Sequence, residues 1–120
     1  MSRRILLVED DEQIRTMVCT FLRMADFEVV TASDGVEALL VTREAHPDLI
    51  LMDMGLPKLN GWQTIQRLRA RRDTANIPII ALTAYVMDED RQRALAIGCN
   101  DFEVKPIDFD RLLGKINALL

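Results

Sequence analysis

The sequence predicts a doubly wound α/β domain in which a parallel five-stranded sheet carries helices on both faces. Short apolar runs alternate with segments whose apolar residues recur every three or four positions, a pattern typical of strands alternating with amphipathic helices. The connections between these segments are only a few residues long. Such alternation indicates five consecutive βα units, which build a parallel sheet.

Five apolar runs predict the strands, at residues 5–8, 27–32, 49–52, 79–82 and 102–104. The first, third and fourth runs are uninterrupted, as expected of strands that are covered on both faces. The second and fifth runs contain the charged residues Glu28 and Glu103, so we expect these two strands at the edges. The strand order 2-1-3-4-5 satisfies this and keeps the crossovers right-handed.

The segments between the strands predict five helices, with the apolar stripe of each facing the sheet. The stripes of the first and second helices contain Ile14, Met17, Val18, Phe21 and Leu22, then Val36, Leu39 and Leu40. The stripes of the third and fifth helices contain Trp62, Ile65 and Leu68, then Phe109, Leu112, Leu113, Ile116 and Leu120. We expect Ser33 or Asp34 to cap the second helix. The fourth helix, over residues 87–97, ends at Gly98 and contains six consecutive polar residues, so we expect it to be weakly held.

Length, composition and charge indicate one soluble globular domain over residues 1–120. The hydrophobic share of 49% and the charged share of 28% exclude a disordered chain. No apolar run is long enough to span a membrane, and the N-terminus has no signal-peptide pattern. The net charge of −4 argues against direct binding of nucleic acid. We therefore expect a protein with neither a membrane nor a nucleic acid as its direct partner.

The cysteines and the basic residues have plain structural interpretations. Cys19 and Cys99 lie far apart, which predicts the reduced environment of the cytoplasm, with Cys19 packed in the core and Cys99 partly exposed in a loop. With His46 as the only histidine, a structural zinc site is disfavoured. Four arginines cluster near the end of the third helix, where we expect them to complement its dipole; they are Arg67, Arg69, Arg71 and Arg72.

Carboxylates, a hydroxyl and an ammonium follow the strands of the predicted sheet. In an open α/β sheet, sites form outside the carboxyl ends of the strands, here between the first and third strands. The residues at these ends are Glu9, Asp10 and Asp11, then Asp53, Thr83 and Lys105 with Pro106. Carboxylates brought together repel one another unless something neutralises them, and a hard divalent cation such as Mg²⁺ or Mn²⁺ does so. The same acids argue against a flavin or dinucleotide site, which needs glycines and backbone N–H groups after the first strand.

These residues together resemble the receiver domain of bacterial two-component response regulators. The motifs are Leu7-Val8-Glu9-Asp10-Asp11, Asp53-Met54-Gly55-Leu56-Pro57, Thr83-Ala84 and Lys105-Pro106, and the resemblance covers the whole chain. It implies a flavodoxin-like fold and a phosphoacceptor switch in place of an enzyme in the usual sense. By this resemblance Asp53 takes a phosphoryl group from a sensor histidine kinase, from a histidine phosphotransfer protein, or from a small donor such as acetyl phosphate.

The resemblance also implies roles for the residues around Asp53. The metal ligands would be Glu9, Asp10, Asp53 and the backbone carbonyl of Gly55, with Glu9 acting directly or through water. Lys105 would pair with a phosphoryl oxygen, and a cis bond to Pro106 would aim it into the site. Asp11 is interpreted as a helix N-cap.

A further implication concerns switching. Thr83 would donate its hydroxyl to the phosphoryl group, and Phe102 would then turn inward, while Tyr85 would lie at the rim of the site. Because Phe102 lacks the hydroxyl of the commoner tyrosine, we expect its inward orientation to be accessible without phosphate. We expect the fourth helix, fifth strand and fifth helix to bind a downstream protein.

Several alternatives remain at this point. The main hypothesis is a stand-alone receiver of the cell-cycle or chemotaxis type, which the start at Met1 favours; the alternative is a receiver cut from a hybrid histidine kinase or a larger response regulator. An aspartyl phosphatase resembling the haloacid-dehalogenase family is disfavoured, because Gly55 stands where that family has a second Asp. A receiver that binds partners without phosphorylation is disfavoured by the complete set of acids, Thr83 and Lys105.

Overall fold

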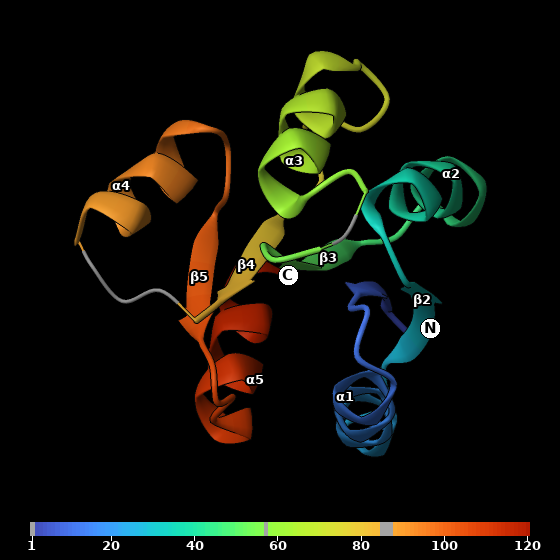
Figure 1. The fold of residues 1–120 in the computed structure, drawn as a ribbon. Coiled ribbons are helices and arrows are strands. Elements are labelled where there is room, and N and C mark those ends of the chain that lie inside the picture. The colour runs from blue at the N-terminus through green and yellow to red at the C-terminus, as the bar shows by residue number, and fades with distance from the viewer. Residues whose placement is uncertain (1, 57, 85–87) are drawn as a thin grey trace.

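The computed structural model describes residues 2–56, 58–84 and 88–120, which form a parallel five-stranded sheet (Figure 1). The strand order is β2-β1-β3-β4-β5, as predicted from the charges in the sequence. The strands are β1 (Arg4–Val8), β2 (Glu28–Ala32), β3 (Leu49–Asp53), β4 (Ile79–Thr83) and β5 (Asp101–Val104). The predicted doubly wound α/β class is therefore confirmed.

Five helices cover the two faces of the sheet. They are α1 (Glu12–Met24), α2 (Gly35–Ala45), α3 (Gly61–Ala70), α4 (Asp88–Ala96) and α5 (Phe109–Leu119). Helices α1 and α5 lie on one face, and α2, α3 and α4 lie on the other (Figure 1). Successive strand residues point to opposite faces, so Ile5 and Leu7 pack against α1 and α5, while Leu6 and Val8 pack on the other side. None of the described helices has the length and apolar character needed to cross a membrane.

Aspartates predicted from the sequence cap the N-termini of α1 and α2. Asp11 accepts a hydrogen bond from the Ile14 N–H at the start of α1, which confirms Asp11 as an N-cap. Asp34 accepts one from the Glu37 N–H at the start of α2. Each such cap is worth about 1 kcal/mol. The cap at Asp11 places the start of α1 directly after Glu9 and Asp10, the two residues that follow β1.

The predicted apolar stripes of α1 and α2 are partly wrong. Met17, Val36 and Leu40 are 51%, 51% and 55% exposed. In α2 the buried face instead contains the small residues Gly35 and Ala38. A Cβ on Gly35 would collide with the Leu59 carbonyl oxygen and with a side-chain atom, so small residues let α2 approach the chain before α3 closely.

Cys99 is buried, contrary to the partly exposed position expected from the sequence. Gly98 adopts a φ of 114°, in the left-handed region that favours glycine, and Cys99 then packs into the core beside Ala94. Burial raises the pKa of the Cys99 thiol to about 12, so it is protonated at neutral pH.

Arg69 does more than complement the dipole of α3. Its guanidinium donates to the carbonyl oxygens of Gly98 (2.9 Å) and Ala75 (3.0 Å), and to Asn100 Oδ1 (3.0 Å). Asn100 Oδ1 also accepts the Ile79 N–H at 2.9 Å, at the start of β4. Arg69 therefore ties α3 to the segments that lead into β4 and β5.

Replacing Arg69 by lysine should lower the free energy of unfolding by about 1–3 kcal/mol, because an ammonium cannot reproduce the planar fork of donors. Urea denaturation measures the loss. Arg67 lies on the same helix and is exposed, so Arg67→Lys is a matched control that should change stability by less than about 0.5 kcal/mol. Equal losses of stability in the two variants would contradict the role of Arg69 in tying α3 to the segments that lead into β4 and β5.

A cation–π contact joins α3 to α4. The guanidinium carbon of Arg93 on α4 lies 4.3 Å from the ring centroid of Trp62 on α3. Among the described side chains of α4, at residues 92–96, only Ala94 is buried and Leu95 is half exposed. Trp62 is thus a partly buried packing residue whose ring faces α4.

Candidate functional site

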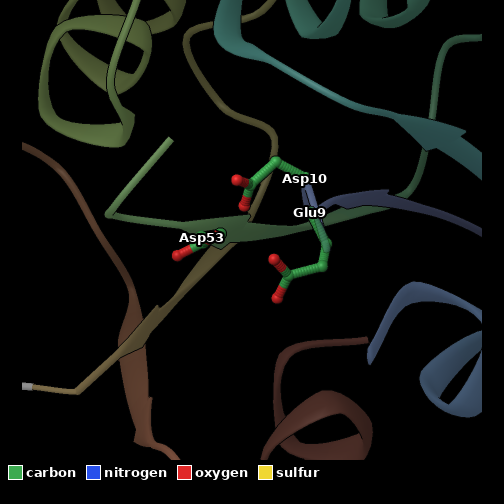
Figure 2. A group of neighbouring side chains, drawn as sticks. All are labelled: Glu9, Asp10 and Asp53. Carbon is green, nitrogen blue, oxygen red and sulfur yellow. The ribbon is translucent and has the colours of Figure 1, made fainter. Parts of the chain in front are cut away.

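Three carboxylates gather at the carboxyl edge of the sheet (Figure 2). Glu9 and Asp10 directly follow β1, and Asp53 is the last residue of the neighbouring strand β3. One carboxylate oxygen from each of the three residues lies within 4.8 Å of the others. Glu9 and Asp53 are buried and Asp10 is exposed. The sequence therefore correctly placed these acids together.

Lys105 reaches this cluster from the end of β5. Its Nζ lies 3.0 Å from Glu9 Oε1 and 3.3 Å from Asp53 Oδ1. The peptide bond from Lys105 to Pro106 is cis, as expected. The Lys105 N–H donates to the Thr83 carbonyl oxygen at 2.8 Å, which holds the ends of β4 and β5 together.

Gly55 and Thr83 complete the surroundings of Asp53. The Gly55 N–H donates to Asp53 Oδ1 at 3.0 Å. Thr83 and Gly55 line a cavity of about 240 Å³ together with Asp53 and Lys105. Tyr85, expected at the rim, lies outside the described residues.

The pKa values of Glu9 and Asp53 are shifted in opposite directions. Burial, followed by the neighbouring Asp53, raises the pKa of Glu9 to about 7 against the opposing effect of Lys105. Burial alone would raise the pKa of Asp53 too, but the Gly55 N–H, Glu9 and Lys105 outweigh it and hold that pKa below its usual value. Asp53 is therefore the more readily ionised member of the pair.

The donor set fits a hard divalent cation. Glu9, Asp10 and Asp53 offer only carboxylate oxygens, which are the ligands that Mg²⁺ prefers. Their charge exceeds the single positive charge of Lys105, so a cation would relieve repulsion that the protein leaves in place.

Two residues that support the site were missed in the sequence. Arg15 on α1 donates from its guanidinium to the Glu9 carbonyl oxygen at 2.9 Å and so holds the backbone that carries Glu9 and Asp10. Gly61 begins α3, and a Cβ there would lie 2.6 Å from the Asp53 carbonyl oxygen and 2.7 Å from Met54 Cα. The start of α3 therefore packs directly on the backbone that carries Asp53.

Replacing Gly61 by alanine should destabilise the protein by about 1–3 kcal/mol, because backbone atoms around Asp53 must move to admit the methyl group. Scanning calorimetry measures the change in melting temperature. Gly114 on α5 is the matched control, since a Cβ there meets nothing within 4 Å. Gly114→Ala should stabilise the helix by up to about 1 kcal/mol. A Gly61→Ala variant as stable as the wild type would contradict the close packing.

Glu103 is a buried charge on an edge strand. Its strand lies at the edge, as predicted, and the carboxylate is fully buried. Arg111 and Lys115 of α5 each approach it to 2.8 Å, and two cations make this burial tolerable. The neighbouring Phe102 is partly buried and packs against the core cluster of α2, α3 and α4. Its accessible inward orientation stays a prediction.

Comparisons with known proteins agree with this geometry. The family model described as the response regulator receiver domain matches residues 5–117. The chain is 42% identical over 120 residues to the phosphate regulon transcriptional regulatory protein PhoB of Escherichia coli, covering 100% of this chain and 52% of that protein. It is 38% identical over 117 residues to the DNA-binding dual master transcriptional regulator RpaA of Synechocystis, covering 98% of this chain and 48% of that protein. The chain thus spans about half the length of the curated relatives it matches.

Solved structures show the same likeness. The chemotaxis response regulator CheY4 of Vibrio cholerae superposes with a TM-score of 0.94 at 32% identity, covering 100% of both chains. The receiver domain of the sensor histidine kinase PA1611 of Pseudomonas aeruginosa, which holds a magnesium ion in its active site cleft, superposes with a TM-score of 0.91 at 34% identity, covering 99% of this chain and 98% of that one. The chain belongs to the response regulator receiver domain family of two-component signalling.

Proposed function

We propose that this chain is a phosphorylation switch that accepts a phosphoryl group on Asp53. The observation that carries the proposal is the position of Asp53, an ionised and largely buried carboxylate that lies 3.3 Å from Lys105 Nζ and lines a cavity at the sheet edge. Receiver domains act as phosphoacceptor switches rather than as classical enzymes, and they interact with histidine kinases or phosphotransfer proteins. The proposed donor is a phosphohistidine of such a partner, or acetyl phosphate.

The chemistry is one substitution at phosphorus. A carboxylate oxygen of Asp53 forms a bond to phosphorus while the bond from phosphorus to the donor's histidine nitrogen breaks, and that imidazole leaves with the electron pair. Lys105 stays positively charged, since burial would lower its pKa but the two carboxylates beside it outweigh burial and raise it. Its ammonium then shifts from the carboxylates to a phosphoryl oxygen, and the Thr83 hydroxyl donates to another.

A divalent cation completes the proposal. Mg²⁺ or Mn²⁺ held by Glu9, Asp10, Asp53 and the Gly55 carbonyl oxygen would neutralise the negative charge of the transferring group. Thr83 and Phe102 would pass the change to the surface formed by α4, β5 and α5, which would bind a downstream protein. In a stand-alone receiver this surface would be the whole output; in a longer regulator or hybrid kinase it would contact other domains, with the same site residues.

The test is the intact mass of the protein after incubation with acetyl phosphate, with and without Mg²⁺. The wild type should gain the mass of one phosphoryl group only when Mg²⁺ is present, and Asp53→Asn should gain none. Asp26 is exposed at a φ of 70°, which asparagine also tolerates, so Asp26→Asn is a matched control that should gain the full mass. Equal uptake by Asp53→Asn and the wild type would place the phosphoryl group elsewhere and refute the proposal.

A further inference from the structure

The outer edge of β5 is a potential site of strand addition. β5 is the last strand of the sheet, so among the described residues only β4 pairs with it. Along a strand, successive residues direct their backbone N–H and C=O groups to opposite sides. The Lys105 N–H donates to Thr83 in the direction of β4, and therefore the backbone groups of Phe102 point away from the sheet. An unpaired edge of this kind is a template for another strand.

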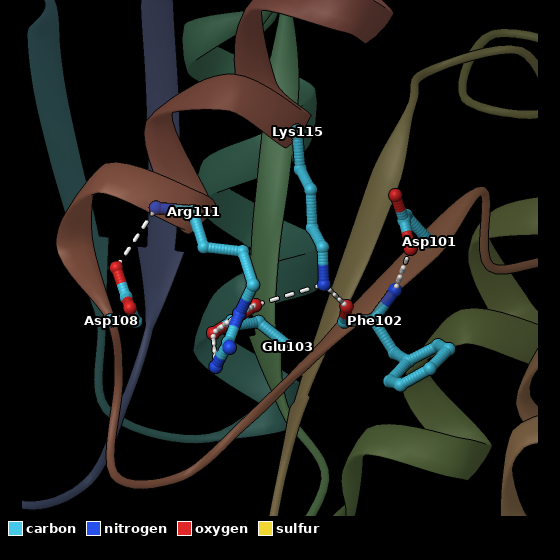
Figure 3. A network of polar contacts seen from close by, with 6 residues as sticks. All are labelled: Asp101, Phe102, Glu103, Asp108, Arg111 and Lys115. Carbon is cyan, nitrogen blue, oxygen red and sulfur yellow. Dashed lines mark hydrogen bonds and ion pairs between the residues drawn. The ribbon is translucent and has the colours of Figure 1, made fainter.

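Side chains occupy both outward groups of Phe102 (Figure 3). Its N–H donates to Asp101 Oδ1 at 2.8 Å. Its carbonyl oxygen accepts from Lys115 Nζ at 2.5 Å. A strand approaching this edge would have to displace both contacts before it could form a hydrogen bond with Phe102.

Lys115 is held in this position by more than its contact with the edge. Its Nζ lies 2.8 Å from Oε1 of the fully buried Glu103 and 5.2 Å from the ring centroid of Phe102. Glu103 is fixed in turn by Arg111, whose Nε and terminal nitrogen donate to it at 2.8–3.0 Å (Figure 3). A lysine on an open surface would lose the entropy of a flexible chain in order to cap a backbone carbonyl. Here the buried carboxylate already holds the ammonium in place.

We propose that Asp101 and Lys115 close the edge of β5 against strand addition, and that the strand they exclude is β5 of a second copy of this chain. In a dimer with a two-fold axis, the same surface of both chains forms the interface. The β5 edge of one chain could therefore pair with the β5 edge of a second chain. Charged side chains, lysine above all, are a general means by which proteins block such edges. Here Lys115 caps the Phe102 carbonyl oxygen directly.

The closure of the β5 edge has a consequence for the surface formed by α4, β5 and α5, which we propose binds a downstream protein. A partner that binds α4, β5 and α5 would have to contact side chains, because the backbone of the edge is already occupied. That consequence rests on the proposed function. The closure of the β5 edge does not depend on the proposed function. Its test can therefore fail while Asp53 is still phosphorylated, and phosphorylation of Asp53 can fail while the edge is still closed.

The experiment is the oligomeric state of Asp101→Ala/Lys115→Met, measured by light scattering and sedimentation over a range of concentrations. The molar mass of this variant should rise with concentration from the 13.7 kDa of one chain toward twice that value, while the wild type shows no such rise. Hydrogen exchange of the Val104 amide, which faces outward like that of Phe102, should slow as the dimer forms. The control is Asp101→Asn/Lys115→Arg, which keeps an acceptor and a cation and should behave as the wild type.

Three outcomes would overturn the proposal: a mass equal to that of the wild type at every concentration, a dimer without slower exchange at Val104, or equal dimerisation of the control. If loss of Lys115 unfolds the chain by leaving Glu103 short of a cation, the variant with Glu103→Gln added removes that buried charge. It should fold and form the same dimer, and a folded variant that stays monomeric would likewise overturn the proposal.

Discussion

Replacing Lys105 by methionine should slow phosphoryl uptake from acetyl phosphate by about 10²–10³-fold, the usual cost of losing one charged donor aimed at a transferring group. Lys105 Nζ contacts both Glu9 and Asp53, at 3.0 and 3.3 Å, and is the cation nearest to the proposed nucleophile among the described ion pairs. Methionine keeps an unbranched, flexible side chain and removes the terminal ammonium with its charge and its donors. The initial rate of mass gain in the presence of Mg²⁺ measures the effect.

Lys58 provides the matched control for this variant. Its side chain is 73% exposed, and its ion pair with Asp34 is long, at 3.6 Å. Lys58→Met should therefore leave the rate within about twofold of the wild type, since exposed pairs of this kind contribute little. A Lys105→Met variant that takes up phosphate at the rate of the control would show that the ammonium has no part in the transfer.

The second large effect concerns stability. Replacing Arg111 and Lys115 together by methionine should lower the free energy of unfolding by about 3–5 kcal/mol, because the fully buried Glu103 then has no cation beside it. Adding Glu103→Leu to these substitutions should recover most of the loss, since a buried ion network can often be replaced by apolar side chains. Urea denaturation at low protein concentration measures both variants. A triple variant no more stable than the double one would show that packing, not charge, causes the loss.

The same network predicts a pH dependence. Burial alone would raise the pKa of Glu103, but the hydrogen bonds from Arg111 and Lys115 outweigh it and hold that pKa below its usual value of 4.5. An acid whose pKa is lowered by folding stabilises the protein above its unfolded pKa, and this stabilisation is lost as the pH falls through the folded value. The stability difference between the wild type and Glu103→Gln should therefore be full at neutral pH and shrink below pH 4.5.

Glu103 also illustrates what the sequence could and could not predict. A charge within an apolar run correctly placed β5 at the edge, but it gave no indication that the side chain itself is buried. The partners that allow its burial, Arg111 and Lys115, lie 8 and 12 residues further along and belong to the next helix. Nothing in the pattern of one strand identifies counterions supplied by another element.

The site was easier to predict than the helix faces. Glu9, Asp10, Asp53 and Lys105 were predicted together because the carboxyl ends of parallel strands meet at one edge. The order of the strands makes the ends of β1 and β3 neighbours, and the long side chain of Lys105 reaches them from the end of β5. The buried face of α2 depends instead on how closely α2 approaches the chain before α3. Its small residues allow that contact, and the more apolar Val36 and Leu40 are left outside.

The stacking of Arg93 on Trp62 gives this protein a built-in optical reporter. Trp62 is the only tryptophan of the chain, so all of its indole fluorescence comes from the contact between α3 and α4. Any displacement of α4 that moves the guanidinium off the ring changes the electric field at the indole and hence its emission. The position of the helix can therefore be followed in real time, in the unlabelled protein, with no engineered dye.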